Sequence, residues 1–151
     1  MTTRTPSQVL TPLALALALL ACSAAAELPS VKVYKTATCG CCSKWADQLA
    51  DAGFEVKTED VENIWAVKDA HGVPRSLGSC HTALVEGYFV EGHVPIADVE
   101  RLLEERPDIA GIAVPGMPIG SPGMEGPNPE RYDVIAVGHD GSTEVYATHG
   151  P

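Results

Sequence analysis

Hydrophobic and polar residues alternate along two short stretches in the first half of the chain. Residues 31–36 read VKVYKT, and residues 54–61 read FEVKTEDV. A period of two is typical of a half-buried strand, and the β-branched residues in both stretches favour the same structure. The pattern therefore predicts two strands.

Between these strands the apolar residues follow the spacing of a helix. Cys42, Trp45, Ala46 and Leu49 fall on one side, and charged residues fall mostly on the other. Such a stripe is typical of a helix that packs on a core. Gly53 follows where a helix commonly ends, in the left-handed conformation that glycine tolerates best.

The middle of the chain predicts a short helix, a hairpin and a third helix. The short helix covers residues 64–70, and residues 81–92 read HTALVEGYFVEG, two strands joined at Glu86-Gly87. In the third helix an apolar face is followed by Pro107, which stops the helix. That inward face consists of Ile96, Val99, Leu102 and Leu103.

The resulting order is β-α-β-α-β-β-α, which predicts an α/β fold. A βαβ unit followed by an antiparallel hairpin and a helix is the thioredoxin-like arrangement. After this core, residues 109–126 are rich in Gly and Pro and predict an ordered loop. Residues 132–148 predict a C-terminal β-hairpin that turns at Asp140-Gly141 and adds strands at a sheet edge.

The first 26 residues have the layout of a secretory signal peptide. They carry one basic residue, then the apolar run PLALALALLAC, then small residues. The run is too short to span a membrane. Two outcomes are open: cleavage after Ala26, or lipoprotein processing at Cys22, which would give a lipid anchor. Either outcome predicts a single mature domain over residues 27–151 that works outside the cytoplasm, most simply in a bacterial periplasm.

The charge balance argues against some partners. The chain has 20 acidic and 10 basic residues, a net charge of −10. An acidic protein is a poor match for nucleic acid or for an anionic membrane surface. We therefore expect no nucleic-acid partner.

Three cysteines gather just before the first predicted helix. The segment TATCGCCSKW places Cys39, Cys41 and Cys42 where a thioredoxin-like fold keeps its working cysteines. The third strand of that fold runs antiparallel to the first, so the loop entering it, with Cys80 and His81, should lie beside the motif. His93 should lie near the same pole, although a histidine there is more often a hydrogen-bonded loop residue than a ligand.

Thiolate and thioether sulfur atoms favour Cu(I), and thiolates also suit zinc and iron-sulfur clusters. If the loop after the third helix returns across the domain, Met117 and Met124 would join the cysteines. The dipole at a helix N-terminus should lower the pKa of the thiols in the cysteine motif. A lowered pKa would help both a metal ligand and a redox nucleophile.

Two other roles for the cysteines are open. Cys39 and Cys42 form a C-x-x-C pair, which is typical of a thiol-disulfide oxidoreductase. In an oxidising compartment the cysteines could instead form structural disulfides, with Cys39–Cys42 and Cys41–Cys80 as one arrangement.

Three blocks of sequence resemble the CopG family of periplasmic copper-resistance proteins, formerly a domain of unknown function. They are TATCGCCSKWADQLADAGFEV, GVPRSLGSCHTALVEGYFVEGHVP and AVPGMPIGSPGMEG. The resemblance extends from about residue 31 to residue 149. It implies a thioredoxin-like fold, a multinuclear Cu(I) site and a role in interconverting Cu(I) and Cu(II).

Carried over position by position, the resemblance implies a set of metal ligands. Its members are Cys39, Cys41, Cys42 and Cys80, with Met117, Met124 and His81 as further ligands or neighbours of the site. The sequence thus predicts a copper-binding protein of copper resistance or homeostasis, with periplasmic copper-handling or redox proteins as candidate partners.

Overall fold

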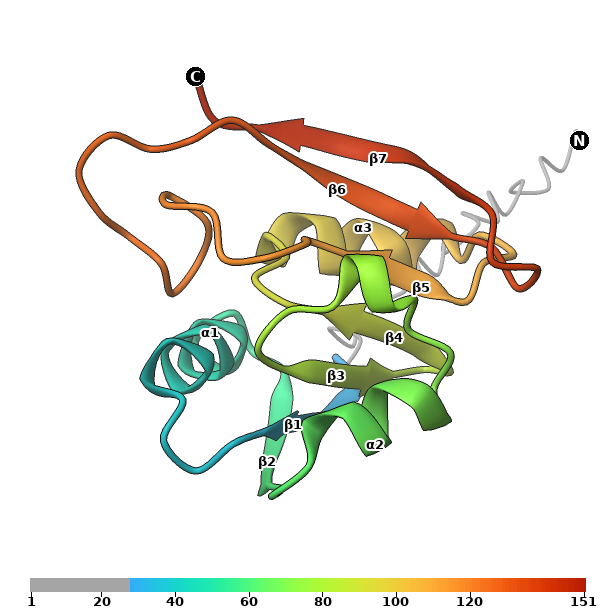
Figure 1. Cartoon of the computed structure of the whole chain (residues 1–151), viewed down its shortest axis with the longest axis horizontal. Helices are drawn as coiled ribbons and strands as arrows, with labels where there is room; N and C mark the ends of the chain where they lie inside the picture. Colours follow the sequence, from blue (N-terminus) through green and yellow to red (C-terminus); the bar gives the residue numbers. More distant parts are fainter. Residues whose placement is uncertain (1–27) are drawn as a thin grey trace, which may run out of the picture.

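A computed structural model describes residues 28–151 (Figure 1). The predicted signal peptide and Cys22 lie outside the described residues. Within residues 28–151, no helix is long and apolar enough to cross a membrane.

One seven-stranded sheet runs through the molecule in the order β2-β1-β3-β4-β5-β6-β7. The strands are β1 (Ser30–Lys35), β2 (Glu55–Asp60), β3 (Thr82–Val85), β4 (Tyr88–Glu91), β5 (Gly111–Ala113), β6 (Tyr132–Val137) and β7 (Thr143–His149). The helices are α1 (Gly40–Asp51), α2 (Ile64–Ala70) and α3 (Ile96–Glu105), with a 3-10 turn, η1, over Arg75–Leu77.

The first four strands and three α-helices have the predicted order and pairing. β1 and β2 are parallel, whereas β3 is antiparallel to both β1 and β4. Glu86 and Gly87 both have positive φ at the β3–β4 turn, as a tight hairpin turn requires. The α/β class and the thioredoxin-like order are therefore confirmed.

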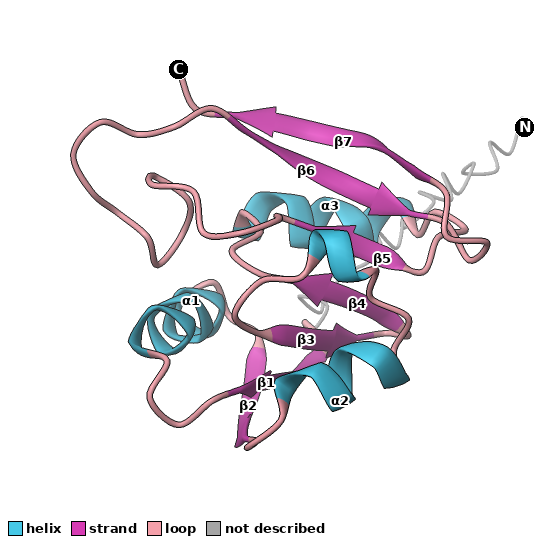
Figure 2. Ribbon diagram, in the orientation of Figure 1, coloured by secondary structure: helices cyan, strands magenta, loops and turns pink. Residues whose placement is uncertain are grey.

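The predicted C-terminal hairpin is also confirmed, and it continues the same sheet. β6 and β7 pair antiparallel and stand at the sheet edge (Figure 2). They join the core through β5, which pairs parallel with β4 and antiparallel with β6. The sequence did not predict β5, because three buried residues inside a Gly/Pro-rich stretch are too few to show a period.

Two apolar clusters lie on opposite faces of the sheet. Trp45 and Leu49 of α1 pack with Val99 and Leu102 of α3 in the larger cluster. The smaller cluster gathers around Phe89 and includes residues from the segment after α2. Trp65 of α2 belongs to neither cluster: its side chain is 36% exposed, with the Arg75 guanidinium 4.9 Å from its ring.

The loop between β5 and β6 returns to the N-terminal end of α1 (Figure 1). A Cβ atom built on Gly123 would lie 2.7 Å from the carbonyl oxygen of Cys41. This contact brings the methionine-bearing loop to the pole that holds the cysteines.

Candidate metal centre

The cysteine motif spans the junction between the β1–α1 loop and the first turn of α1. Cys39 is the N-cap residue, and its carbonyl oxygen accepts a hydrogen bond from the Ser43 amide. The apolar stripe of the helix turns Cys42 inward, where it is fully buried. Cys41 is one helical position earlier and remains partly exposed.

Four sulfur atoms meet at this pole. Cys39 and Cys42 are joined by a disulfide, while Cys41 and Cys80 are free. The Cys41 Sγ atom lies 3.6 Å from the Cys39 Sγ atom and 3.9 Å from the Cys80 Sγ atom. All four sulfur atoms lie within 4.8 Å of one another. A cluster of this size can hold a metal ion once the disulfide is reduced.

The antiparallel pairing of β1 with β3 brings Cys80 to the motif. Tyr34, near the end of β1, pairs with Thr82 at the start of β3. The loop that enters β3 therefore lies beside the loop that leaves β1. The order of elements in the sequence predicted that Cys80 would lie beside the cysteine motif, and the structure confirms it.

His93 lies closer to the Cys80 sulfur than the Cys41 sulfur does. Its Nε2 atom lies 3.0 Å from the Cys80 Sγ atom, and its Nδ1 atom lies 2.8 Å from the carbonyl oxygen of Pro122. Because a carbonyl oxygen only accepts hydrogen bonds, Nδ1 carries the proton and Nε2 faces the sulfur as an acceptor. Sequence reasoning placed His93 at this pole but did not choose it as a site residue.

His81 lies beside the same sulfur and is fully buried. Its Nδ1 atom is 3.8 Å from the Cys80 Sγ atom, and its ring lies 4.5 Å from the ring of Trp45 and 5.0 Å from that of His93. Its Nε2 atom is the only buried side-chain nitrogen or oxygen in residues 28–151 without a hydrogen-bond partner. Cys80, His81 and His93 thus form a second group of metal-ligating atoms within 4.8 Å of one another.

The two methionines border separate clefts on this pole. Met124 and Cys41 line a cleft of about 460 Å³ together with Lys44 and Glu125. Met117 and Cys80 line another cleft of about 270 Å³. Met117 is 52% exposed. The return of the loop therefore places one methionine at the cleft of each of the two free cysteines.

Comparison with known proteins decides the family. Two solved structures, named "Copper resistance protein copG", forms 2 and 1, match with 45% and 44% identity and a TM-score of 0.78 each. The matches cover 82% and 83% of this chain and 100% of each of those chains. The chain belongs to the CopG family of copper resistance proteins.

A family model described as "Protein of unknown function, DUF411" also matches, over residues 77–124. No curated protein matches the chain. The model's match covers Cys80, both neighbouring histidines and both loop methionines. CopG relatives thus share the fold of this chain, and their name connects the sulfur cluster with copper.

Burial favours the neutral forms of the groups around Cys80. It raises the pKa of the Cys80 thiol to about 11, with the nearby Cys41 sulfur as the next cause. It also lowers the pKa of His93, and it holds the pKa of His81 well below the usual range of an imidazole. In this member of the CopG family the Cys80–His93 contact is therefore a thiol hydrogen-bonded to an imidazole. The lowered thiol pKa predicted for the helix N-terminus does not extend to Cys80, which lies on a different loop.

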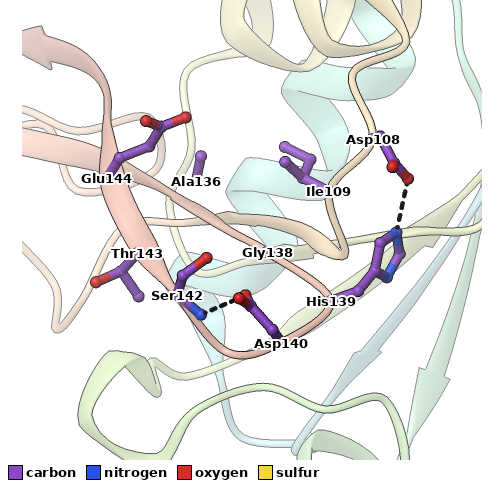
Figure 3. A pocket seen from close by; sticks show the side chains of 9 residues that line it. All are labelled: Asp108, Ile109, Ala136, Gly138, His139, Asp140, Ser142, Thr143 and Glu144. Atoms are coloured by element: carbon purple, nitrogen blue, oxygen red, sulfur yellow. Dashed lines mark hydrogen bonds and ion pairs between the residues drawn. The ribbon is translucent and has the colours of Figure 1, made fainter.

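A cavity of about 520 Å³ lies away from the cysteines, at the β6–β7 end of the sheet (Figure 3). It is lined by residues 108–109 and by the hairpin tip, where the His139 Nε2 atom lies 3.4 Å from Asp108. It contains no sulfur ligand. The sulfur cluster described above therefore lies outside this cavity.

Proposed function

We propose that this protein binds Cu(I) through Cys39, Cys41, Cys42 and Cys80 and serves copper resistance or homeostasis. The observation that carries the proposal is the convergence of these four sulfur atoms from two chain segments. Cu(I) is the common biological ion that thiolates and thioethers hold best in low coordination. The copper-resistance name of the CopG relatives supports the same ion.

The histidines and methionines complete the proposed ligand set. The Cys80 sulfur and the imidazoles of His81 and His93 form a group beside the thiolates. Met124 and Met117 stand at the two clefts through which a copper ion would reach Cys41 and Cys80. In this proposal the cysteines would hold more than one copper ion, and the nitrogen and thioether donors would serve as further ligands.

The Cys39–Cys42 pair, which is a disulfide in this structure, would exchange two electrons with copper and so interconvert Cu(I) and Cu(II). When the two thiolates form the disulfide, they release two electrons, which reduce two Cu(II) ions to two Cu(I) ions. The reverse reaction takes the two electrons back from two Cu(I) ions. Cys41 and Cys80 remain as thiols or thiolates in both states, so they can keep hold of copper while the other pair changes its oxidation state.

Metal analysis of protein that has been reduced and loaded with Cu(I) without oxygen tests the proposal. The wild-type protein should retain more than one equivalent of copper after gel filtration. Cys80→Ala and Cys42→Ala should each lower the stoichiometry, because each removes a thiolate from the cluster. Thiol titration of the same samples checks that all four cysteines are reduced before loading. Reduced wild-type protein that retains no copper would overturn the proposal.

The disulfide between Cys39 and Cys42 favours a second candidate function, that of a thiol-disulfide oxidoreductase. That function needs only the C-x-x-C pair. It predicts that copper-free protein reduces a model disulfide and that Cys41→Ala leaves the rate nearly unchanged. Copper binding instead predicts that Cys41→Ala lowers the copper stoichiometry. The same variant therefore separates the two functions.

We further propose that the protein works in the bacterial periplasm after removal of the leader, or is held at a membrane by a lipid on Cys22. The apolar N-terminal run and the following small residues support export. Mass spectrometry of protein from a periplasmic extract should give either a chain beginning near Glu27 or a lipid-modified Cys22. A full-length chain confined to the cytoplasm would contradict export.

A further inference from the structure

A fully buried ion pair lies directly behind the Cys80 loop. Lys68 of α2 and Glu91 of β4 have no exposed side-chain surface, and the Lys68 Nζ atom lies 2.5 Å from the Glu91 Oε1 atom. Thr82 of β3, also buried, donates a hydrogen bond to the Glu91 Oε2 atom at 2.7 Å. It accepts one from Lys68 Nζ at 3.0 Å. The pair thus ties a helix to two neighbouring strands.

The carboxylate also reaches the residue next to Cys80. The Ser79 amide donates a hydrogen bond to Glu91 Oε1 at 2.5 Å, and the Ser79 hydroxyl donates one to the carbonyl oxygen of Gly116. Ser79 lies close against the backbone of Gly92, where an added Cβ atom would come within 2.6 Å of the serine side chain. Ser79 is therefore held from the core by Glu91 and joined to the loop that carries Met117.

Stability alone does not explain why this ion pair is buried. Apolar residues of the same volume are often as stabilising or more so, because burying two charges costs desolvation free energy. Such residues could not accept the hydrogen bond of the Ser79 amide, which is partly buried, and withdrawing an amide from water without giving it a partner is itself costly. Lys68 neutralises the carboxylate, and the carboxylate provides the acceptor that fixes the loop.

We propose that Glu91, paired with Lys68, is a positioning residue that sets the place of Cys80 in the copper site. This inference rests on the proposed function. Glu91 acts through Ser79 and touches no proposed ligand atom itself. The hydrogen bond to Ser79 holds the loop at the entrance to β3, so that the Cys80 sulfur stays within 3.9 Å of the Cys41 sulfur. The hydroxyl of Ser79, through its hydrogen bond to the Gly116 carbonyl oxygen, holds the Met117 loop beside the Cys80 loop.

Two double variants separate positioning from charge burial. K68M/E91Q and K68M/E91L both remove the ion pair and keep similar side-chain volumes. Only the glutamine retains a carbonyl oxygen that can accept the Ser79 amide. Cu(I) affinity is measured by competition with a chromophoric Cu(I) chelator, on reduced full-length protein without oxygen. We expect K68M/E91Q to stay within about threefold of wild type and K68M/E91L to bind at least tenfold more weakly, a change of about 1.4 kcal/mol.

A second readout uses metal-free, fully reduced protein. Diamide removes two electrons and two protons from two thiols, and peptide mapping then shows how much Cys41–Cys80 disulfide forms in a fixed time. The glutamine variant should form this disulfide as fast as wild type, and the leucine variant several-fold more slowly. Equal rates and equal affinities in the two variants would overturn the inference.

Two controls keep the outcome readable. In a Cys80→Ser background, the glutamine and leucine variants should have equal Cu(I) affinities, because the positioned sulfur is gone; a persisting tenfold difference would contradict action through Cys80. If the leucine variant does not fold, hydrogen exchange of the Ser79 amide in the wild-type protein provides the test. Protection of this amide supports the inference. Exchange at the rate of a free amide overturns it. Failure of wild type to bind Cu(I) would reject the proposed function instead.

Discussion

At the scale of single residues, Cys80 is the most constrained thiol of the site. Its neighbour His93 receives a fixed orientation from the Pro122 carbonyl oxygen and offers Nε2 to the sulfur. Burial disfavours both the thiolate and the imidazolium, so the two groups share one hydrogen bond without separating charge. A soft cation between them would replace the proton of the thiol. Copper binding at Cys80 should therefore release a proton.

The raised pKa of Cys80 predicts slow alkylation in metal-free protein. With the Cys39–Cys42 disulfide intact, the thiolate fraction of Cys80 should stay small near about pH 8 and increase about tenfold per pH unit until the pH approaches its pKa of about 11. Labelling with iodoacetamide at a series of pH values, followed by mass spectrometry of the Cys80 peptide, measures this profile. In denaturant the same thiol should label as an ordinary cysteine. A native profile with a midpoint below that of the denatured protein would contradict the burial argument.

At the scale of elements, the loop between β5 and β6 borders the candidate site. It is fixed by the Gln48 side chain of α1, which donates a hydrogen bond to Glu125 at 2.7 Å, and by the His93–Pro122 contact. Gly123 has a φ of 81° and lies against the first turn of α1. The backbones of the loop and of α1 lie in contact at Gly123. The loop can take this position only because glycine has no side chain.

Gly123→Ala and Gly141→Ala form a matched pair. Both glycines have positive φ, 81° and 82°, so both substitutions carry a similar backbone cost, on the order of 1 to 2 kcal/mol. A Cβ atom at Gly123 would clash with the Cys41 carbonyl oxygen at 2.7 Å and approach the Trp45 amide at 3.1 Å, whereas Gly141, at the β6–β7 turn, has open space. We expect Gly123→Ala to speed Cu(I) transfer to a chelator at least fivefold, and Gly141→Ala to change it little. Similar transfer rates for the two variants would show that the close approach does not matter for copper retention.

The sequence predicted the helices and strands that have a clear hydrophobic period or end at a Gly or Pro residue. It also predicted where the cysteines at the ends of these elements lie. CGCC could be placed because a strand precedes it and a helical stripe follows, and Cys80 because antiparallel pairing fixes the loop before β3. His93 could not be chosen, because its role depends on the Pro122 carbonyl oxygen, 29 residues away along the chain. The Lys68–Glu91 pair was missed for the same reason: Lys68 looks like a surface lysine until α2 is packed on the sheet.

At the scale of the whole molecule, the sheet holds the two segments of the cysteine site together. The motif follows β1, the Cys80 loop precedes β3, and these strands are direct neighbours. The methionine loop is anchored through β5 and the C-terminal hairpin. At the edge of that hairpin, the His149 Nε2 atom lies 2.6 Å from the buried Asp98 of α3. The site therefore exists in full only in the folded chain.

Copper should consequently stabilise the folded state of the reduced protein. A ligand that binds only the folded state at about 1,000 times its Kd adds about 4 kcal/mol to the free energy of unfolding. For a domain of this size that corresponds to an increase in Tm of about 10 to 20 °C. Differential scanning fluorimetry of reduced protein, with and without Cu(I), measures the shift, and Cys80→Ala should reduce it. His149→Ala is the control, because it leaves Asp98 without its partner and removes no proposed copper ligand. It should lower the Tm of both forms and leave their difference unchanged. An unchanged Tm on loading would mean that copper binds the cysteines of the unfolded chain equally well, and that the fold contributes nothing to the site.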